Sequence, residues 1–428
     1  MSTVDRVPFP NVEETSVTKA DVCMIGLGYI GLPTAVILAD QGLRVHGVDL
    51  NPKHVDAVNA GNVPFVEPAL GEFVKRTVDS GHLSASDTPV PAKNFIVAVP
   101  TPFQEDRTPD LSYIEAAARE LAPQLEGDEL VILESTSPPG ATEHMAEVIM
   151  ECRPDLRDKD VKFAHAPERV LPGRIMVELV ENDRIIGGIT PEAAEAARDL
   201  YSTFCKGELL LTNARTAEMA KLTENSFRDV NIAFANELSV ICARLDIDVW
   251  ELIELANHHP RVNILQPGPG VGGHCIAVDP WFIVAAAPEE SRLIHMARVV
   301  NDDKPEHVMN LIESSVAQAG AAAPKVAMLG LAFKPDIDDL RESPALKITT
   351  EVAQRHPEWQ VLAVEPNVTE LPPVLSNMRN TTYATVDAAI EEADVIVLLV
   401  DHKEFKAVDP HRVADKNVID TKGLWRIK

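Results

Sequence analysis

Short apolar runs alternate with helical stretches over the first two hundred residues. The first run is 21–25 (Asp-Val-Cys-Met-Ile), an apolar helical stretch follows at 32–39, and a second run lies at 43–49. The same pattern continues with runs at 95–100, 130–133, 162–165 and 185–187. Apolar runs of this length between helices are typical of strands in a parallel sheet that has helices on both faces. The pattern predicts an α/β domain over residues 21–204.

The middle of the chain, residues 205–316, shows no clear strand pattern. Apolar residues recur there every three or four positions from Thr216 to Leu245, which predicts a long amphipathic helix. Strand-type runs then return at 325–330, 359–364, 394–400 and 417–420. The predicted fold class is α/β, with two Rossmann-like, doubly wound domains joined by a central helical domain. We expect the C-terminal domain to span 317–428 and the long helix to form the interface of a homodimer or a higher homo-oligomer.

Composition narrows the class of protein. The chain has 428 residues, more than one core usually serves, and 45% of them are hydrophobic. The net charge of −27 argues against nucleic-acid binding and indicates a salt-adapted source, because salt screens the repulsion among surface carboxylates. No apolar run is long enough for a membrane span, and residues 1–20 are polar and acidic, which predicts a disordered leader rather than a signal peptide. Five scattered cysteines fit neither a disulfide framework nor a metal site, so we expect a cytoplasmic protein without a bound metal.

Three glycines follow the first strand, in Gly26-Leu-Gly28-Tyr-Ile-Gly31, and Asp49 closes the second strand. A strand, a glycine turn, a helix and a later acid form the fingerprint of a dinucleotide site. Gly26 allows the tight turn, Gly28 lets a pyrophosphate approach the backbone, and Gly31 allows helix and strand to pack closely. A carboxylate at position 49 binds ribose hydroxyls and repels a 2′-phosphate, which favours NAD over NADP. The predicted cofactor-binding residues are Gly26, Gly28, Tyr29, Ile30, Gly31 and Asp49.

A second glycine-rich stretch, 268–280, reads Gly-Pro-Gly-Val-Gly-Gly-His-Cys-Ile-Ala-Val-Asp-Pro. Glycine lets a backbone and a ligand approach closely, so Cys275 is placed for nucleophilic chemistry, with Asp279 four residues later. Because free cysteine is among the most buried residue types, an inert packing role is the alternative. Lys221 and Asn225 lie four positions apart on one face of the predicted long helix, where a solvated surface pair is the ordinary alternative.

Polar residues also follow other strands. Thr101 and Thr136 come just after the runs at 95–100 and 130–133, where open α/β sheets bind their ligands, although Ser and Thr at such places also cap helices. In the C-terminal domain, the turn Gly330-Leu-Ala-Phe-Lys lacks the full glycine triplet. We expect this domain to bind the nucleotide of a substrate. The candidates for holding its diphosphate are Lys334 and Arg341.

From about residue 21 to the end, these motifs resemble the family of UDP-glucose and GDP-mannose dehydrogenases. The resemblance is carried by Gly-Leu-Gly-Tyr-Ile-Gly, Val-Pro-Thr-Pro, Glu-Ser-Thr, Pro-Glu-Arg, Lys-Leu-Thr-Glu-Asn, the glycine-rich loop with Cys275, and Phe-Lys-Pro…Arg-Glu-Ser. The long stretches 256–282 and 331–343 are similar to the branch of the family that oxidises UDP-N-acetyl-D-mannosamine. The acidic leader and the strongly negative charge depart from that branch, but neither involves a site residue.

The resemblance implies an enzyme that oxidises the C6 primary alcohol of a UDP-sugar to a carboxylate with two NAD⁺. The implied conversion is UDP-N-acetyl-D-mannosamine to UDP-N-acetyl-D-mannosaminuronate. Cys275 would add to an intermediate aldehyde, giving a thiohemiacetal and then a thioester that water hydrolyses. The implied catalytic residues are Cys275, Lys221, Asn225, Asp279, Glu168 and Thr136.

The resemblance also implies roles for single residues. Lys221 would exchange a proton with the C6 oxygen and stabilise an oxyanion, and Asn225 would hold that oxygen. Which of Asp279, Glu168 and Lys221 is the general base stays open. The further cofactor contacts are Thr101, Thr136 and Arg341. The implied substrate-binding residues are Arg169, Val170, Lys221, Asn225, Arg228, His259, Lys334, Arg341, Gly272 and Arg261, the last reaching across a dimer.

Three other interpretations are compatible with the sequence. The first is the same chemistry on UDP-glucose or UDP-N-acetylglucosamine, since a few contacts set the choice of sugar. The second is a simple two-electron dehydrogenase, in which Cys275 is inert and one NADH forms per substrate instead of two. The third is a catalytically silent, NAD-binding regulatory protein. That protein is expected to lack Cys275, Lys221 or Asp279, and all three are present.

Overall fold

The structure is a computed structural model that describes residues 19–65, 67, 69–104, 106–170, 173–273 and 275–426. The chain divides into two compact units. Unit 1 comprises the described residues up to Thr101 together with 111–218, and unit 2 comprises 102–110 and the described residues from 219 onward. The expected disordered leader lies outside the described residues except for its last two. For these two the expectation is wrong, because Lys19 pairs with Glu129 at 3.1 Å and Ala20 begins the first strand.

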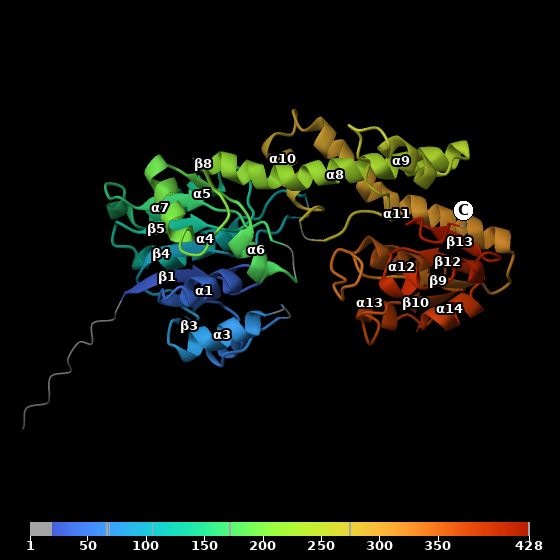
Figure 1. The fold of residues 1–428 in the computed structure, drawn as a ribbon, viewed down its shortest axis with the longest axis horizontal. Helices are drawn as coiled ribbons and strands as arrows, with labels where there is room; N and C mark the ends of the chain where they lie inside the picture. The colour runs from blue at the N-terminus through green and yellow to red at the C-terminus, as the bar shows by residue number, and fades with distance from the viewer. Residues whose placement is uncertain are drawn as a thin grey trace, which may run out of the picture. The chain divides into compact units, whose positions relative to one another are not determined.

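Unit 1 is built on an eight-stranded sheet in the order β3-β2-β1-β4-β5-β6-β7-β8, with helices on both faces (Figure 1). Its strands are β1 (Ala20–Ile25), β2 (Val45–Val48), β3 (Leu83–Ser86), β4 (Ala92–Val97), β5 (Leu130–Leu133), β6 (Lys162–His165), β7 (Arg184–Gly188) and β8 (Leu209–Asn213). Its helices are α1 (Gly31–Asp40), α2 (Pro52–Asn59), α3 (Leu70–Asp79), α4 (Ser112–Leu121), α5 (Ala141–Cys152), α6 (Ile175–Glu181) and α7 (Pro191–Tyr201). The strand order reverses between β1 and β4, which is where doubly wound sheets bind nucleotides.

Two features of this sheet differ from the sequence-based expectation. Strands β6 and β7 pair antiparallel, with Ala164 opposite Gly188, whereas the expectation was a parallel sheet. Among the described residues between them the one helix is the short α6, and an antiparallel neighbour needs no crossover to the other end of the sheet. Strand β8 lies in a stretch for which no strand was expected. It pairs with β7 at the edge of the sheet, where Leu210 and Leu211 are exposed.

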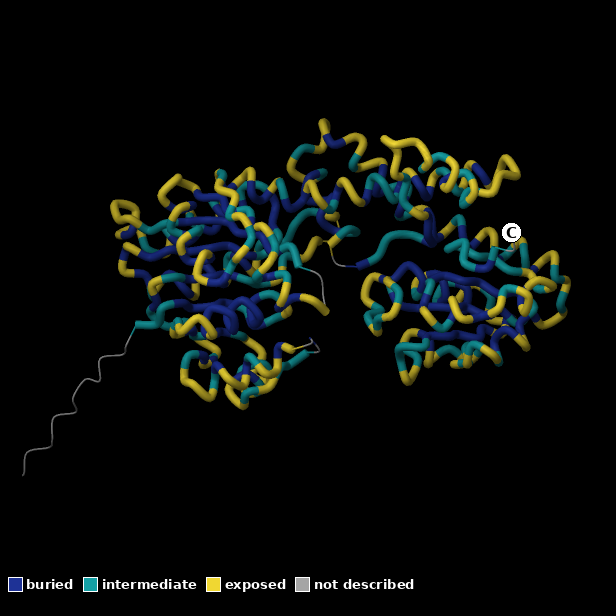
Figure 2. The backbone as a smooth tube through the Cα atoms, viewed as in Figure 1, coloured by how far each residue is buried: buried dark blue, intermediate teal, exposed yellow. Residues whose placement is uncertain are grey.

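Alternate residues of β1 face different cores. Val22 and Met24 pack in the core that includes residues of α1, α3 and α7, whereas Cys23 and Ile25 pack with residues of α4 and α5. Successive side chains of a strand point to opposite faces, so an apolar run of this kind is buried on both sides. Figure 2 shows the inner strands of the sheet as mostly buried, whereas β8 at the edge is half-buried or exposed. The carboxyl ends of β1, β4, β5 and β6 are therefore held by a sheet that is packed on both faces.

Helix α8 (Ala214–Leu245) runs from unit 1 into unit 2 and confirms the predicted long helix, beginning two residues earlier. The other helices of unit 2 are α9 (Val249–Asn257), α10 (Asp279–Ala286), α11 (Arg292–Ala319), α12 (Pro344–Arg355), α13 (Pro373–Ser376), α14 (Val386–Glu392) and α15 (Lys403–Lys406). Its strands are β9 (Lys325–Leu329), β10 (Gln360–Val364), β11 (Thr381–Tyr383), β12 (Val395–Leu398) and β13 (Asn417–Asp420). In the parts of the chain that are described, no helix has the length and apolar character to cross a membrane.

The five strands of unit 2 form a parallel sheet in the order β11-β10-β9-β12-β13. Residues of α11 and α12, such as Ile312 and Ile348, pack on the face that carries Val326, while residues of α14 and α15, such as Phe405, pack on the face that carries Leu329. This order repeats β3-β2-β1-β4-β5 of the first sheet. The α/β fold class with two doubly wound domains and a helical region between them is confirmed.

Candidate functional site

The glycine turn after β1 is crowded at two glycines and open at the third. A Cβ atom at Gly26 would lie 2.4 Å from the carbonyl oxygen of Ala98, and a Cβ atom at Gly31 would lie 2.0 Å from the carbonyl oxygen of Gly26. Gly26 also has a φ of +98°, which side chains disfavour. A Cβ atom at Gly28 would meet no atom within 4 Å. Packing therefore requires Gly26 and Gly31, whereas the space at Gly28 is free for a ligand.

Asp49 lies against this turn. Its Oδ2 accepts a hydrogen bond from the N–H of Leu27 at 3.0 Å, and its Oδ1 accepts one from the N–H of Asn51 at 2.8 Å. The side chain keeps 15% of its surface exposed, so the carboxylate still has room to accept a bond from a ligand. The N-terminus of α1 has no capping side chain at Ile30 and no acid in its first turn, which leaves its positive end available to an anion. These residues fit a dinucleotide with a free ribose diol.

Two predicted threonines follow neighbouring strands of the same sheet. Thr101 comes after β4, and its buried Oγ1 has no hydrogen-bond partner among the described residues. Thr136 follows β5 and is half-buried. Both strands end at the edge where the strand order reverses. The hydroxyl of Thr101 is thus unpaired but buried at this edge. The exposed ring of Tyr29 stacks on Phe65, with ring centroids 4.2 Å apart.

Glu168 follows β6 and is buried together with a partner that the sequence reasoning missed. Its Oε1 accepts a hydrogen bond from the N–H of Arg169 at 2.6 Å, and its Oε2 accepts one from Arg184 at 2.5 Å. Arg184 also donates to Glu134 at 3.2 Å. Arg169 and Val170, which were expected to contact the substrate, are half-buried beside Glu168. The available signal for Arg184 is a charged residue at the start of an otherwise apolar strand.

Unit 2 brings four predicted catalytic residues together. Asn225 of α8 donates a hydrogen bond to Oδ2 of Asp279 at 2.5 Å. Asp279 begins α10, and its N–H donates to the carbonyl oxygen of Cys275 at 2.8 Å. The positive charge of Lys221, one turn before Asn225 on α8, acts on both Asp279 and Cys275. A thiol, a carboxyl, an amide and an ammonium group thus share one site.

The electrostatics of this site favour neutral groups. Burial raises the pKa of Asp279 to about 6, against the opposing effects of the Asn225 hydrogen bond and the Lys221 charge. Cys275 is exposed on one side, but the protein around its sulfur removes enough water to raise the pKa of the thiol. The negative charge of Asp279 raises it further, and Lys221 lowers it. Near neutral pH the thiol is protonated, so a base is needed to activate it.

The glycines of the Cys275 loop face the protein itself. A Cβ atom at Gly272 would lie 2.4 Å from the carbonyl oxygen of Glu342 and 2.6 Å from Cδ of Pro344. Gly273 has a φ of +84°, and a Cβ atom there would lie 3.1 Å from the ring of Phe333. The expectation that the run lets a ligand approach the backbone is therefore incomplete. These two glycines are required by the close approach of the segment 333–344.

The segment 331–343 carries both candidates for the diphosphate. Lys334 and Arg341 are exposed, and the guanidinium group of Arg341 donates to both carboxylate oxygens of Asp339, at 2.8 and 2.6 Å. The remaining predicted substrate residues of unit 2 are also exposed: Arg228 on α8, and His259 and Arg261 after α9. These positive and polar groups are accessible to an anionic ligand.

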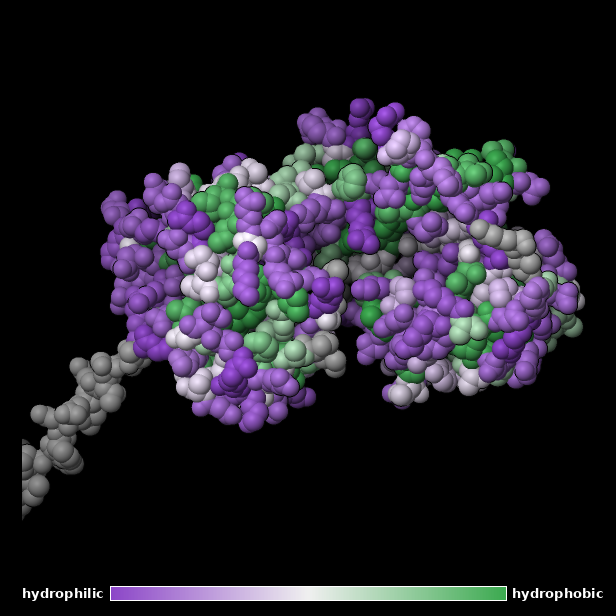
Figure 3. Space-filling view, viewed as in Figure 1, coloured by the Kyte–Doolittle hydropathy of each residue, from purple (hydrophilic) through white to green (hydrophobic). Residues whose placement is uncertain are grey.

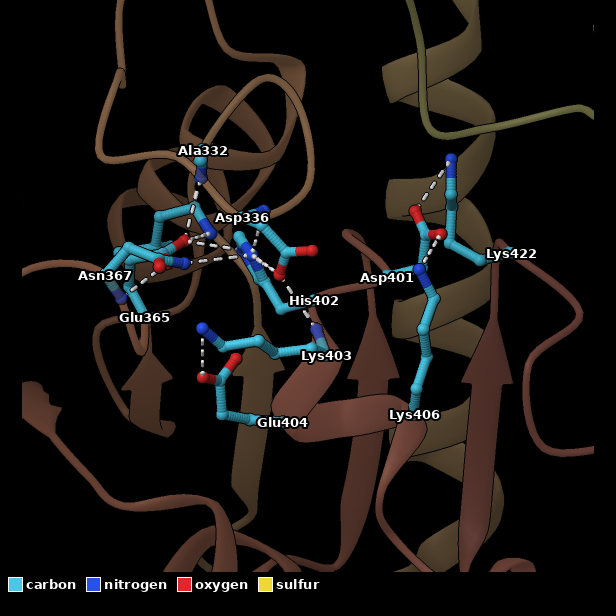
Figure 4. A network of polar contacts seen from close by, with 11 residues as sticks. Ala332, Asp336, Glu365, Asn367, Asp401, His402, Lys403, Glu404, Lys406 and Lys422 are labelled. Atoms are coloured by element: carbon cyan, nitrogen blue, oxygen red, sulfur yellow. Dashed lines mark hydrogen bonds and ion pairs between the residues drawn. The ribbon is translucent and has the colours of Figure 1, made fainter. Parts of the chain in front are cut away.

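A buried acid fixes the start of this segment (Figure 4). Oε2 of Glu365 accepts hydrogen bonds from the N–H groups of Leu331 at 2.8 Å and Ala332 at 3.0 Å, and it lies 3.0 Å from Nε2 of His402. Nδ1 of His402 accepts from the N–H of Asp336 at 2.9 Å. Burial acts to raise the pKa of Glu365, but the hydrogen bonds from His402 and Leu331 outweigh it and lower the pKa to about 2. Neither Glu365 nor His402 was singled out from the sequence.

Sequence profiles of one family match almost the whole described chain. These are the UDP-glucose/GDP-mannose dehydrogenase family NAD binding domain at residues 20–205, its central domain at 215–303 and its UDP binding domain at 327–427. The chain is 56% identical over 418 residues to the UDP-N-acetyl-D-mannosamine dehydrogenase of Salmonella typhi. The alignment covers 95% of this chain and 99% of the relative. It is 53% identical over 414 residues to an NDP-N-acetyl-D-galactosaminuronic acid dehydrogenase of Ralstonia nicotianae, covering 95% and 96%.

Solved structures agree with this. A UDP-D-ManNAc dehydrogenase from Pyrococcus horikoshii is 39% identical, with a TM-score of 0.83 over 95% of this chain and 96% of the other. The UDP-N-acetyl-mannosamine dehydrogenase from Staphylococcus aureus is 41% identical, with a TM-score of 0.83 over 96% of each chain. The likeness extends over the full length of these proteins.

Proposed function

The chain belongs to the UDP-glucose/GDP-mannose dehydrogenase family, and from this we propose that it oxidises the C6 alcohol of UDP-N-acetyl-D-mannosamine to the carboxylate through a covalent cysteine intermediate. The observation that carries the covalent route is the grouping of Cys275, Asp279, Asn225 and Lys221 in one site. A simple alcohol dehydrogenase has no use for a thiol beside a carboxyl group that can accept its proton.

NAD is the cofactor, and its binding residues are proposed to be those around the first glycine turn. When bound, NAD accepts a hydride in each of two oxidations, so one UDP-sugar gives two NADH. The open space at Gly28 and the uncapped N-terminus of α1 support a pyrophosphate there, and Asp49 supports a ribose. The proposed contacts also include Tyr29, Ile30, Thr101, Thr136 and Arg341.

Asp279 and Lys221 are proposed to move the protons. Asp279, with a pKa of about 6, is mostly ionised at neutral pH and accepts the proton of the Cys275 thiol as sulfur adds to the aldehyde. The aldehyde oxygen then carries negative charge, which the Lys221 ammonium and the Asn225 amide stabilise. After the second oxidation a thioester joins Cys275 to C6, and water attacks it, releasing the carboxylate and the thiol. Glu168 is the proposed acid–base group for that water.

The choice of sugar rests on the relatives. The name of the 56% identical relative specifies UDP-N-acetyl-D-mannosamine, and that of the 53% identical relative specifies an N-acetyl-D-galactosaminuronic acid. Both names contain an N-acetylated amino sugar, which favours a 2-acetamido sugar over glucose for this chain. The proposed substrate contacts are Arg169, Val170, Arg228, His259, Arg261, Gly272, Lys334 and Arg341.

Helix α8 is the proposed interface of a homodimer. Phe227, Phe234 and Ile241 are spaced seven residues apart on it and are 71%, 52% and 44% exposed. Figure 3 shows apolar side chains gathered around the C-terminal end of α8, where Leu245 and Ile247 are also exposed. Residues seven apart lie on one face of a helix, and an exposed apolar stripe is typical of a protein interface. Light scattering that gives twice the chain mass of 46.7 kDa supports the dimer.

The experiment that tests the proposed function is a count of NADH. Purified protein with NAD and a panel of UDP-sugars is expected to form two NADH per UDP-N-acetyl-D-mannosamine consumed, and to work more slowly on UDP-glucose and UDP-N-acetylglucosamine. Cys275→Ser is expected to lose turnover to the carboxylate by about 10³-fold or more, because a serine hydroxyl is a far weaker nucleophile at neutral pH. Cys152→Ser, at an exposed cysteine remote from these motifs, is the matched control. One NADH per substrate, or full activity of Cys275→Ser, contradicts the proposal.

A further inference from the structure

A buried cluster of charges lies beneath the carboxyl ends of β5 and β6. Arg184, at the start of β7, donates from one terminal nitrogen to Glu134 at 3.2 Å and from the other to Glu168 at 2.5 Å. The three side chains are 4%, 0% and 8% exposed. The guanidinium carbon also lies 4.4 Å from the centre of the Tyr201 ring. One buried cation therefore serves two carboxyl groups.

The two carboxyl groups are not equivalent. Burial raises the pKa of Glu134 to about 7, against the pull of Arg184 and with support from the like charge of Glu168. Oε1 of Glu134 accepts hydrogen bonds from Tyr201 at 3.1 Å and Thr34 at 3.4 Å, while its buried Oε2 has no partner among the described residues. A net negative charge is costly in a buried site, so one of the two groups keeps its proton. Glu134 is that group, and the charge of Arg184 is left to Glu168.

Glu168 lines a cavity about the size of one water molecule. A cavity of about 10 Å³, the room that one water needs, is lined by Pro167, Glu168, Arg169, Glu178, Asn182, Asp183 and Arg184. The Glu168 carboxylate is held on both oxygens, by the backbone N–H of Arg169 and by Arg184. The other ionisable groups around it are Arg169, Glu178 and Asp183 on the cavity wall, and Glu134 and Tyr201 behind Arg184. The only cation bonded to the Glu168 carboxylate, among the described residues, is Arg184.

We infer that Arg184 is a positioning residue, which balances the charge of the Glu168 carboxylate and fixes it beside this water-sized cavity. The inference rests on the proposed role of Glu168 as an acid–base group, and it adds a partner that acts through Glu168 without touching the substrate. If Arg184 is removed, the buried Glu168 carboxylate loses its bonded cation, and a proton is the group that can replace that charge. The loss is then a loss of base at neutral pH, which a higher pH restores.

The test is the pH profile of kcat for NADH formation, from about pH 5 to 9.5, with UDP-N-acetyl-D-mannosamine and NAD saturating. Asp279, with a pKa of about 6, contributes the same acidic limb in every variant, so the readout is how far a variant's limb lies above that of the wild type. In Arg184→Met the acidic limb is expected to move up by about one pH unit or more, so that kcat at a pH on that limb falls about tenfold and recovers near pH 9. Arg184→Lys keeps a cation with fewer donors, so its limb is expected between those of the wild type and Arg184→Met. The KM values for both substrates are expected to stay within about threefold of wild type.

Two controls separate charge from packing. Glu134→Gln alters the same buried cluster but leaves the charge of Arg184, so its acidic limb is expected within about 0.3 pH unit of wild type. Arg157→Met removes an arginine that pairs with Glu147 at 2.5 Å on the surface, and it is expected to leave the profile unchanged. If Arg184→Met does not fold, as a melting curve shows, the comparison of Arg184→Lys with Glu134→Gln decides.

The outcomes are distinct. An unmoved limb in Arg184→Met or Arg184→Lys, or an equal upward shift in Glu134→Gln, overturns the inference. Glu168→Gln is measured beside them. Full activity of Glu168→Gln refutes the proposed role of Glu168 and the inference with it. An inactive Glu168→Gln together with an unmoved limb in the Arg184 variants refutes the inference alone. Neither result affects the NADH stoichiometry, which tests the covalent route.

Discussion

Replacement of Glu365 by glutamine is expected to destabilise the C-terminal domain by about 2–3 kcal/mol at neutral pH. The Glu365 carboxylate accepts hydrogen bonds from Leu331 N, Ala332 N and His402 Nε2 on Oε2, and from the N–H and amide groups of Asn367 on Oε1. Glutamine presents one oxygen and one NH₂ group to these donors, so whichever way it turns, at least two bonds are lost and donors face each other. Bonds to a charged acceptor contribute about 1.5–3 kcal/mol each, part of which is offset because a buried charge is also removed.

The pKa of Glu365 gives an independent magnitude. A pKa lowered from 4.5 to about 2 corresponds to about 3 kcal/mol in favour of the ionised form in the folded state, and to roughly 2 kcal/mol after allowance for solvent screening. Because the folded-state pKa is lowered, this stabilisation is fully present above about pH 4.5 and is lost as the pH falls toward 2. The difference in stability between wild type and Glu365→Gln is therefore expected to shrink over that range.

The assay is urea unfolding followed by tryptophan fluorescence. All four tryptophans lie in unit 2, and Trp359 and Trp425 are buried in the two cores of the C-terminal sheet. Glu392→Gln is the matched control, because Glu392 pairs with Lys325 at 2.9 Å on the surface of the same domain, and such a pair contributes less than about 1 kcal/mol. A loss below about 0.5 kcal/mol in Glu365→Gln, or an equal loss in the control, refutes the reasoning.

Three further predictions follow from the site and the charge. Asp279→Asn is expected to abolish turnover but to stabilise the fold above pH 6 by about 1–2 kcal/mol. The reason is that the pKa of Asp279 is raised to about 6, so the ionised carboxylate destabilises the folded state. A lower melting temperature in the variant contradicts this. Gly28→Ala is expected to keep the wild-type melting temperature but to weaken NAD binding about tenfold or more. Gly31→Ala is expected to melt at a lower temperature, because its Cβ atom meets the Gly26 carbonyl oxygen. Calorimetry measures the melting temperatures, and NAD titration measures the binding. With a net charge of −27, the protein is expected to melt at a higher temperature in about 1 M KCl than in dilute buffer, and indifference to salt argues against a salt-adapted source.

Most strands that the sequence predicts are buried on both faces. In β5 and β12 every residue is apolar and buried, and in β1 and β9 only the first residues are not, so a short apolar run is a sufficient signal. The exception is the edge strand β13, which was predicted although it is only half-buried. The strands β3, β8 and β11 lie at sheet edges and expose alternate or successive side chains, which leaves no such run. The direction of β7 is not a local property at all. It depends on how the chain returns after β6, which only the tertiary structure decides.

The same distinction holds for the site. Cys275 and Asp279, or Lys221 and Asn225, stand four residues apart, so a motif or a helix period finds each pair. The hydrogen bond between Asn225 and Asp279 joins α8 to α10, and no pattern in the sequence predicts it. Arg184 and Glu365 are further from prediction, because each looks like an ordinary charged residue at one end of an apolar strand. Their importance comes from complete burial, and burial is the result of packing by segments that are distant in sequence.

The glycine turns after β1 and β9 have the same backbone geometry but differ in the acid that binds them. Gly26 donates to the Val48 carbonyl oxygen at 2.8 Å, and Gly330 donates to the Val364 carbonyl oxygen at 2.8 Å, with φ values of +98° and +92°. In both domains an acid after the neighbouring strand accepts a hydrogen bond from the residue after that glycine. Each acid also has a histidine partner, His54 for Asp49 at 3.2 Å and His402 for Glu365 at 3.0 Å, so the difference is one methylene group and the extent of burial.

Asp49 is shorter, and its side chain remains partly exposed at the turn, where we propose that a ribose binds. Glu365 reaches beneath its turn, binds two backbone N–H groups and His402, and has no exposed surface left. Since a carboxylate with every accessible position taken cannot bind a sugar hydroxyl, the second domain cannot hold a nucleotide in the way that the first does. A nucleotide bound there must be recognised by other groups, and the exposed cations Lys334 and Arg341 lie on the segment whose start Glu365 binds.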